Sequence, residues 1–116
     1  MDLDGLAATI DVDVAGSVER FAGHRPIFVK YLKRFPREST FTAFLADAQS
    51  RDLQKLEVSA HTLKGICANL GLVSLARAYD RVVKDIRASN SDDLDAALSE
   101  ATVLHQRTIA AIEELD

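Results

Sequence analysis

Residues 53–71 read LQKLEVSAHTLKGICANLG, and this stretch decides the fold. Its apolar residues recur at alternating spacings of three and four, the period of one face of a helix packed in a bundle. They are Leu53, Leu56, Ala60, Leu63, Cys67 and Leu70. At about 100° per residue, His61 projects roughly 130° from the centre of this apolar stripe, and Lys64 lies on the flank of the same side. The stretch therefore predicts a bundle helix from which His61 and Lys64 both reach solvent.

Gly65 interrupts this predicted helix four residues after His61. Glycine in a helix interior costs about 1 kcal/mol relative to alanine. Such a cost is expected where another molecule must approach the backbone closely. The sequence therefore predicts an access point beside His61.

The chain before this helix contains two further helical segments. Ser17 or Gly16 caps a short predicted helix that ends at Gly23. A long helix then opens with Pro26 in its first turn and continues through residue 45. Because the apolar period resumes beyond Pro36, we favour a kink in one long helix over a true break at that proline.

Two more long helices follow the histidine-bearing one, which Asp52 caps and which ends near Gly71. The apolar pattern places them at about residues 73–88 and 94–115, and the polar run 89–93 forms the turn between them. Short connections between long helices favour antiparallel neighbours. We predict an all-α protein, an antiparallel up-down-up-down four-helix bundle with a short extra N-terminal helix.

Composition narrows the class of protein. The 116 residues are 47% hydrophobic and 28% charged, as expected for one globular domain covering residues 1–116. A net charge of −4 without a basic stripe argues against a nucleic-acid partner. No apolar run is long enough to span a membrane, and residues 1–4 lack the basic start of a signal peptide. The lone Cys67 lies on the apolar stripe and fits a buried thiol in a reducing compartment, so we expect a cytoplasmic protein.

The other two histidines serve as a contrast to His61. His24 lies in the turn before a proline, and His105 lies on the last helix without a lysine or glycine nearby. We expect both at the surface or at a helix edge. No two histidines stand three or four residues apart with a carboxylate partner, and the predicted interior is apolar throughout, so a metal-binding bundle is unsupported.

The exposed His61 has the chemistry of a phosphoryl acceptor. Imidazole is a nitrogen nucleophile that is neutral near pH 7, so it needs no adjacent base. The ammonium of Lys64, one turn away, is suited to stabilise the charge on a phosphoryl group in transfer. No glycine-rich nucleotide-binding loop occurs in the chain, so the pattern predicts a carrier without kinase activity of its own.

The set His61, Lys64, Gly65 and Gly71 resembles the shared pattern of histidine-containing phosphotransfer (HPt) domains, H-x-x-K-G with a second glycine a few residues on. The similarity extends to the Phe21-Ala22-Gly23 turn and to Leu45, Ala48 and Asp52 before the active helix. It implies that His61 is phosphorylated on its outer ring nitrogen, that Lys64 stabilises the phosphate, and that Gly65 leaves clearance for a receiver domain. Gly71 matches the second motif glycine. We expect Ala68, Asn69 and Gly71 to contact the partner, because Ala68 is small and Asn69 projects about 150° from the apolar stripe.

The same resemblance implies the partners. These are response-regulator receiver domains, a hybrid histidine kinase, or both. Because an up-down bundle shields a single core by itself, we expect the carrier to be a monomer. The carrier itself holds no cofactor or metal, and the divalent cation that phosphoryl transfer needs is expected on the receiver. Lys33 and Arg37 are further candidates to face an acidic receiver site. For Asn69, a helix-terminal capping role stays open beside partner contact.

Two positions depart from the family pattern. Ile66 follows the motif glycine, where serine or alanine is common, and Val83 stands where a Glu or Gln often orients the imidazole. The sequence therefore predicts that His61 is held less firmly, or is held by Asp80 or Lys84. The alternative function is a helical docking or regulatory module that binds a signalling partner on the same surface without phosphoryl transfer.

Overall fold

A computed structural model describes all 116 residues and is helical from end to end. The seven α-helices and one 3-10 helix are α1 (Leu3–Thr9), α2 (Val14–Arg20), α3 (Arg25–Arg34), η1 (Phe35–Arg37), α4 (Ser39–Ser50), α5 (Leu53–Asn69), α6 (Val73–Arg87) and α7 (Ser91–Glu113). The all-α prediction is confirmed. None of these helices combines the length and the apolar character that a membrane crossing needs.

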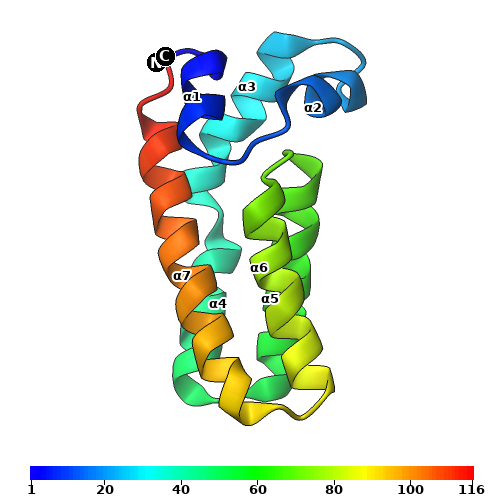
Figure 1. Ribbon diagram of the computed structural model, residues 1–116, viewed down its shortest axis with the longest axis vertical. Helices are drawn as coiled ribbons and strands as arrows, with labels where there is room; N and C mark the ends of the chain where they lie inside the picture. The colour runs from blue at the N-terminus through cyan, green and yellow to red at the C-terminus, as the bar shows by residue number, and fades with distance from the viewer.

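The long helices form an elongated bundle measuring 40 × 24 × 22 Å. In Figure 1 the chain descends through α3 and α4, ascends through α5, descends through α6 and ascends through α7. Each of α4, α5 and α6 packs against the helix that follows it, and α7 closes the bundle against α3 and η1. The arrangement leaves one face of α5 directed away from the core.

The second predicted helix is broken at Pro36, and the expectation of a kink in one continuous helix is wrong. Helix α3 ends at Arg34, and Pro36 lies in the 3-10 turn η1. Glu38 then adopts an extended backbone, and its carboxylate caps α4 by accepting a hydrogen bond from the Thr40 amide. Because proline lacks an amide hydrogen and clashes with the preceding turn, the helix restarts after it.

Two short helices, rather than one, precede the bundle. Helix α2 begins at Val14 because the carboxylate of Asp13 accepts a hydrogen bond from the Gly16 amide at 3.0 Å, so the expected cap at Gly16 or Ser17 is wrong. Helix α1, absent from the sequence prediction, is capped by Asp2 in the same way. Both α1 and α2 lie across the end of the bundle that holds the chain termini (Figure 1).

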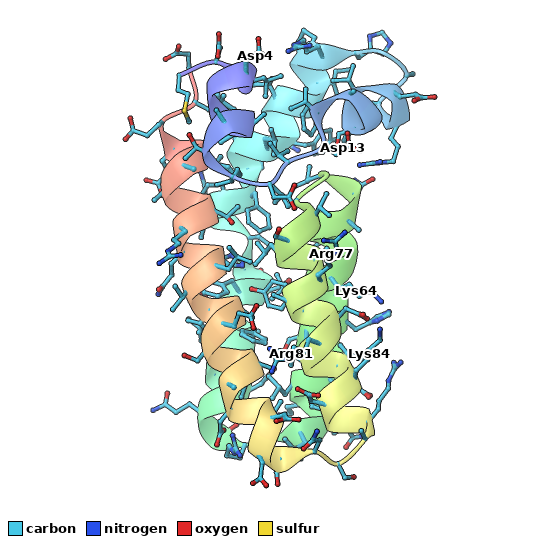
Figure 2. The ribbon with its side chains drawn as sticks, in the orientation of Figure 1. Asp4, Asp13, Lys64, Arg77, Arg81 and Lys84 are labelled. Atoms are coloured by element: carbon cyan, nitrogen blue, oxygen red, sulfur yellow. The ribbon has the colours of Figure 1, made fainter.

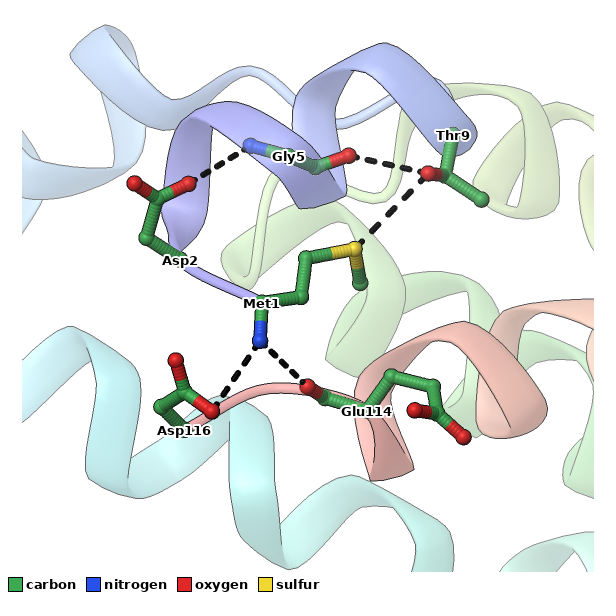
Figure 3. A network of polar contacts seen from close by, with 6 residues as sticks. All are labelled: Met1, Asp2, Gly5, Thr9, Glu114 and Asp116. Carbon is green, nitrogen blue, oxygen red and sulfur yellow. Dashed lines mark hydrogen bonds and ion pairs between the residues drawn. The ribbon is translucent and has the colours of Figure 1, made fainter.

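Helix α1 is held against the end of α7 by a polar network at the termini (Figure 3). The N-terminal ammonium of Met1 donates to the Glu114 carbonyl at 2.9 Å and lies 3.0 Å from the Asp116 carboxylate. The Met1 carbonyl in turn accepts a hydrogen bond from the Asp116 amide at 2.8 Å. Thr9 closes the last turn of α1 through its hydroxyl, which donates to the Gly5 carbonyl.

The core is one cluster of 25 buried apolar residues, but it also contains a histidine. His105 on α7 is fully buried, so its expected surface position is wrong. Its Nδ1 lies 2.5 Å from the hydroxyl of Tyr79 on α6, and its ring stacks on Phe41 at 3.6 Å between centroids. Burial lowers the pKa of His105 to about 4, so the ring is neutral near pH 7. The interior is therefore aromatic and partly polar at this level of the bundle.

Candidate functional site

His61 stands on the outer face of α5 and is exposed, as predicted. The buried face of the helix fixes its direction, because Ala60 and Leu63 on either side are fully excluded from solvent. Asp52 begins the helix by accepting a hydrogen bond from the Lys55 amide at 3.1 Å, which confirms the predicted cap. The apolar stripe is buried from Leu56 onward, whereas Leu53 in the first turn is exposed. A rigid, well-anchored helix thus presents the imidazole to solvent.

Gly65 leaves the surface beside the imidazole open. A Cβ atom built at Gly65 would meet no other atom within 4 Å. No neighbour in the fold therefore requires a glycine here, and the helix bears the propensity cost of about 1 kcal/mol without a packing reason. The observation supports the prediction that this position serves an approaching molecule.

Lys64 points along the α5–α6 edge and is paired across it. Its Nζ lies 2.8 Å from Oδ1 of Asp80, and Nζ of Lys84 lies 2.8 Å from Oδ2 of the same carboxylate. Asp80 therefore bonds to both lysines, neither Asp80 nor Lys84 bonds to His61, and the expectation that one of them holds the ring of His61 is wrong. Val83 is buried in the core and offers the ring no partner. The imidazole of His61 therefore makes no side-chain hydrogen bond within the protein.

The C-terminal end of α5 is held by a residue that the sequence did not single out. The guanidinium of Arg20 donates to the carbonyl oxygens of Ala68 at 3.2 Å and Asn69 at 3.3 Å, and to the Ser17 hydroxyl at 2.9 Å. Arginine near a helix C-terminus satisfies carbonyls that lack partners within the helix. The side chains of Ala68 and Asn69 themselves are exposed. They remain candidates for partner contact.

Gly71 is buried, which corrects its expected place on the contact surface. It adopts a left-handed backbone with φ of +71°, and the Leu72 amide donates to the Cys67 carbonyl at 2.9 Å, the pattern of a helix end closed by glycine. A Cβ atom here would overlap the Ser17 hydroxyl and lie 2.7 Å from the Asp13 carbonyl oxygen. Gly71 therefore ends α5 and lets α2 pack across that end.

Two depressions flank the exposed face of α5. Between α4 and α5 a groove of about 430 Å³ contains Val58, whose side chain is 63% exposed one turn before His61. Between α3 and α5 a hollow of about 280 Å³ is lined by Tyr31, Ile66 and Asn69. Ile66, one of the departures from the family pattern, is thus half-buried at the edge of this hollow. Both depressions therefore lie on the α3–α4 edge of α5, one before and one after the histidine along the helix.

Lys33 and Arg37 do not belong to this face. They line a hollow with Ile112 and Glu113 of α7. The basic residues nearest to α5 come from α6, where Figure 2 shows Lys84 on the same side as Lys64, whereas Arg81 lies on the side that faces α7. Arg81 is paired with Glu100 of α7 at 2.7 Å, whereas Arg77 is exposed and has no ion-pair partner.

Comparison with known protein families identifies this architecture. A family model described as the Hpt domain matches residues 37–115, which include α4 through α7 and both His61 and Lys64. No curated protein and no solved structure matched the chain. Because the family model covers more than half of the chain, the protein belongs to the Hpt family. Membership implies histidine phosphotransfer in two-component phosphorelays, a class of phosphocarriers whose partners are receiver domains and kinases.

Proposed function

We propose that this protein is a reversible phosphoryl carrier that accepts a phosphoryl group on His61 from the aspartate of one receiver domain and passes it to another. The observation that carries the proposal is the exposed imidazole of His61 on α5, a helix whose opposite face is buried in the core. Lys64 and the open Gly65 lie about one turn further along the same helix. A side chain that accepts a phosphoryl group from another protein must project from the surface and be reached by that protein, so it does not need an enclosed pocket. The α5 face meets both requirements.

The transfer step is a direct displacement at phosphorus. The lone pair of Nε2 forms the new P–N bond, and the electron pair of the breaking P–O bond leaves with the aspartyl oxygen as a carboxylate. The proton on Nδ1 stays on the ring. Reversal, with a second receiver's carboxylate as nucleophile, returns the imidazole to its starting state. The ammonium of Lys64 stabilises the negative oxygens in both directions.

The divalent cation belongs on the receiver in this proposal. The chain has no group of three His, Cys, Asp or Glu side chains placed to hold a metal ion, which supports that assignment. The carrier then contributes only the nucleophile and the Lys64 charge. We infer a single domain over residues 1–116 that acts as a monomer, since its one apolar core is already shielded by its own helices. The proposed exchange with receiver domains would take place in the cytoplasm.

Docking is proposed to use the α5 face with its two flanking depressions. Val58 and Gly65 bracket the histidine along the helix, and Ala68 continues the line of small or apolar side chains toward Tyr31. Arg77 and Lys84 on the neighbouring helix provide positive charge for an acidic receiver site. Exchange with two receivers in turn requires a transient encounter and not a permanent complex.

The test is phosphotransfer from a panel of phosphorylated receiver domains. Label that is labile in acid, stable in alkali and absent from His61→Gln supports the carrier. Receiver binding without any label on the wild-type protein would instead favour the docking module. With an active receiver, Lys64→Ala is expected to slow transfer roughly tenfold, about 1.4 kcal/mol in the barrier, with the fold unchanged.

The docking surface has its own matched pair of variants. Val58→Asp places a charge on the proposed surface, whereas Val103→Asp places the same charge on an exposed valine of α7. We expect only Val58→Asp to weaken receiver binding, by roughly tenfold, measured by titration calorimetry. Equal effects of the two variants would remove Val58 from the interface.

A further inference from the structure

Asp80 holds the phosphate-stabilising lysine before any phosphoryl group arrives. Its two carboxylate oxygens are each 2.8 Å from an ammonium, Oδ1 from Lys64 on α5 and Oδ2 from Lys84 on its own helix. Lys84 is the residue one turn further along α6, and Figure 2 shows Lys64 and Lys84 on the same side of the molecule. The three groups form a bridge with a net charge of +1.

The bridge keeps Asp80 ionised. Hydrogen bonds from Lys64 and then from Lys84 lower the pKa of this carboxyl below its ordinary value. The resting partner of Lys64 is therefore a full carboxylate. The side chain of Lys64 is 41% exposed and that of Asp80 is 26% exposed, so the lysine can leave the carboxylate without disturbing the core.

A phosphoryl group on His61 competes for the same ammonium. It arrives three residues from Lys64 on the same helix, a spacing at which side chains are neighbours. When Lys64 turns to the phosphoryl oxygens, Asp80 loses one of its two partners but keeps Lys84. The exchange therefore never leaves a lone carboxylate at the helix interface.

Resting on the proposed function, we propose that Asp80 is a positioning residue that competes with the phosphoryl group for Lys64, and that Lys84 balances this competition. The pair thereby sets how the phosphoryl group partitions between His61 and the receiver aspartate. Weaker retention of Lys64 favours phosphohistidine, and stronger retention favours return to the receiver. A carrier that must both accept and donate requires the two states to be close in free energy.

The expected shifts follow from the sign of each change. Asp80→Asn releases Lys64, so the equilibrium ratio of phosphorylated carrier to phosphorylated receiver rises by roughly threefold, in keeping with the small value of exposed ion pairs. Lys84→Met leaves Asp80 dependent on Lys64, so the ratio falls by a similar factor. Asp80→Glu retains the charge and restores a ratio close to that of the wild type.

A matched carboxylate separates this mechanism from a general field effect. Glu57 is four residues before His61 and bridges α5 to α6 through Arg87 at 3.0 Å, without contacting Lys64. Glu57→Gln removes the same charge at the same helix pair, and its effect is expected to be smaller than that of Asp80→Asn. In a Lys64→Met background, Asp80→Asn should have no further effect on the ratio.

The experiment equilibrates each carrier variant with one phosphorylated receiver and measures the label on both proteins, with thermal melts to verify folding. The inference is supported if Asp80→Asn raises the ratio and Lys64→Met abolishes that rise. It is overturned if Asp80→Asn leaves the ratio at the wild-type value, or if the rise persists in the Lys64→Met background. Absence of label on wild-type His61 would overturn the proposed function itself, so the two failures are distinguishable.

Discussion

The two helical histidines His61 and His105 have opposite environments. His61 on α5 is exposed and bonded to nothing, whereas His105 on α7 is fully buried, stacked on Phe41 and hydrogen-bonded to Tyr79. The exposed ring keeps a free lone pair for chemistry. In the buried ring, Nδ1 is hydrogen-bonded to the Tyr79 hydroxyl and Nε2 has no partner. The contrast shows that the neighbours, not the residue type, decide which histidine is open to solvent.

Removal of the buried His105 ring is expected to have the largest effect on stability. His105→Ala leaves a cavity among aromatic side chains and deprives the Tyr79 hydroxyl of its partner, so the free energy of unfolding should fall by about 3–5 kcal/mol. His61→Ala removes an exposed ring and should change it by less than about 0.5 kcal/mol. Denaturant titration measures both. Similar losses for the two variants would contradict the assigned environments.

Acid should affect stability through the buried histidine. The unfolded chain takes up a proton on His105 near its ordinary pKa of 6.5, whereas the folded chain does so only near pH 4. Stability is thus fully present above pH 6.5 and is lost as the pH falls toward 4, by roughly 3 kcal/mol. The same titration on His105→Leu should lack this part of the slope. An identical slope in both proteins would refute the assignment.

The hydrogen bond between Tyr79 and His105 should make a smaller contribution to stability than the whole buried ring. Tyr79→Phe leaves the Nδ1 atom of His105 unpaired in the core and should cost about 1–2 kcal/mol in the free energy of unfolding. Tyr31→Phe is the matched control, because Tyr31 is 43% exposed and its hydroxyl makes no hydrogen bond within the protein. Chemical denaturation should show the loss only for Tyr79→Phe.

The smallest expected effect is a gain in the free energy of unfolding from a substitution on the exposed face of α5. Gly65→Ala should raise the free energy of unfolding by up to about 1 kcal/mol, since the added methyl group meets open space and alanine favours the helix. Gly71→Ala should lower it, because its backbone is left-handed and its neighbours leave no room. Thermal melts compare the two variants. A destabilised Gly65→Ala would show that the surface beside His61 is not open.

The sequence predicted the parts of the molecule that depend on local periodicity. Helices α5 and α6, the Asp52 cap and the exposure of His61 all follow from spacing within a single helix. The break at Pro36 did not, because an apolar period continues across a proline whether the helix bends or restarts. Helix α1 was missed because it is only seven residues long and its signal is one capping aspartate.

The remaining features depend on contacts between helices, which one sequence does not reveal. His105 is buried because Phe41 and Tyr79 from two other helices surround it. The ion pair of Asp80 with Lys64 crosses the α5–α6 interface. Gly71 is buried because α2 returns over the end of α5. Each of these features required the fold to bring distant segments together.

The central claim is tested most directly by locating the phosphoryl group in the protein. Trypsin separates the three histidines, because residues 21–30, 56–64 and 88–107 form separate peptides that contain His24, His61 and His105. After incubation with a phosphorylated receiver domain, digestion at alkaline pH and mass spectrometry should place the added phosphoryl mass on residues 56–64 alone. His105→Leu should still acquire it, and His61→Gln should not. Phosphoryl mass on another peptide, or undiminished labelling of His61→Gln, would contradict the account.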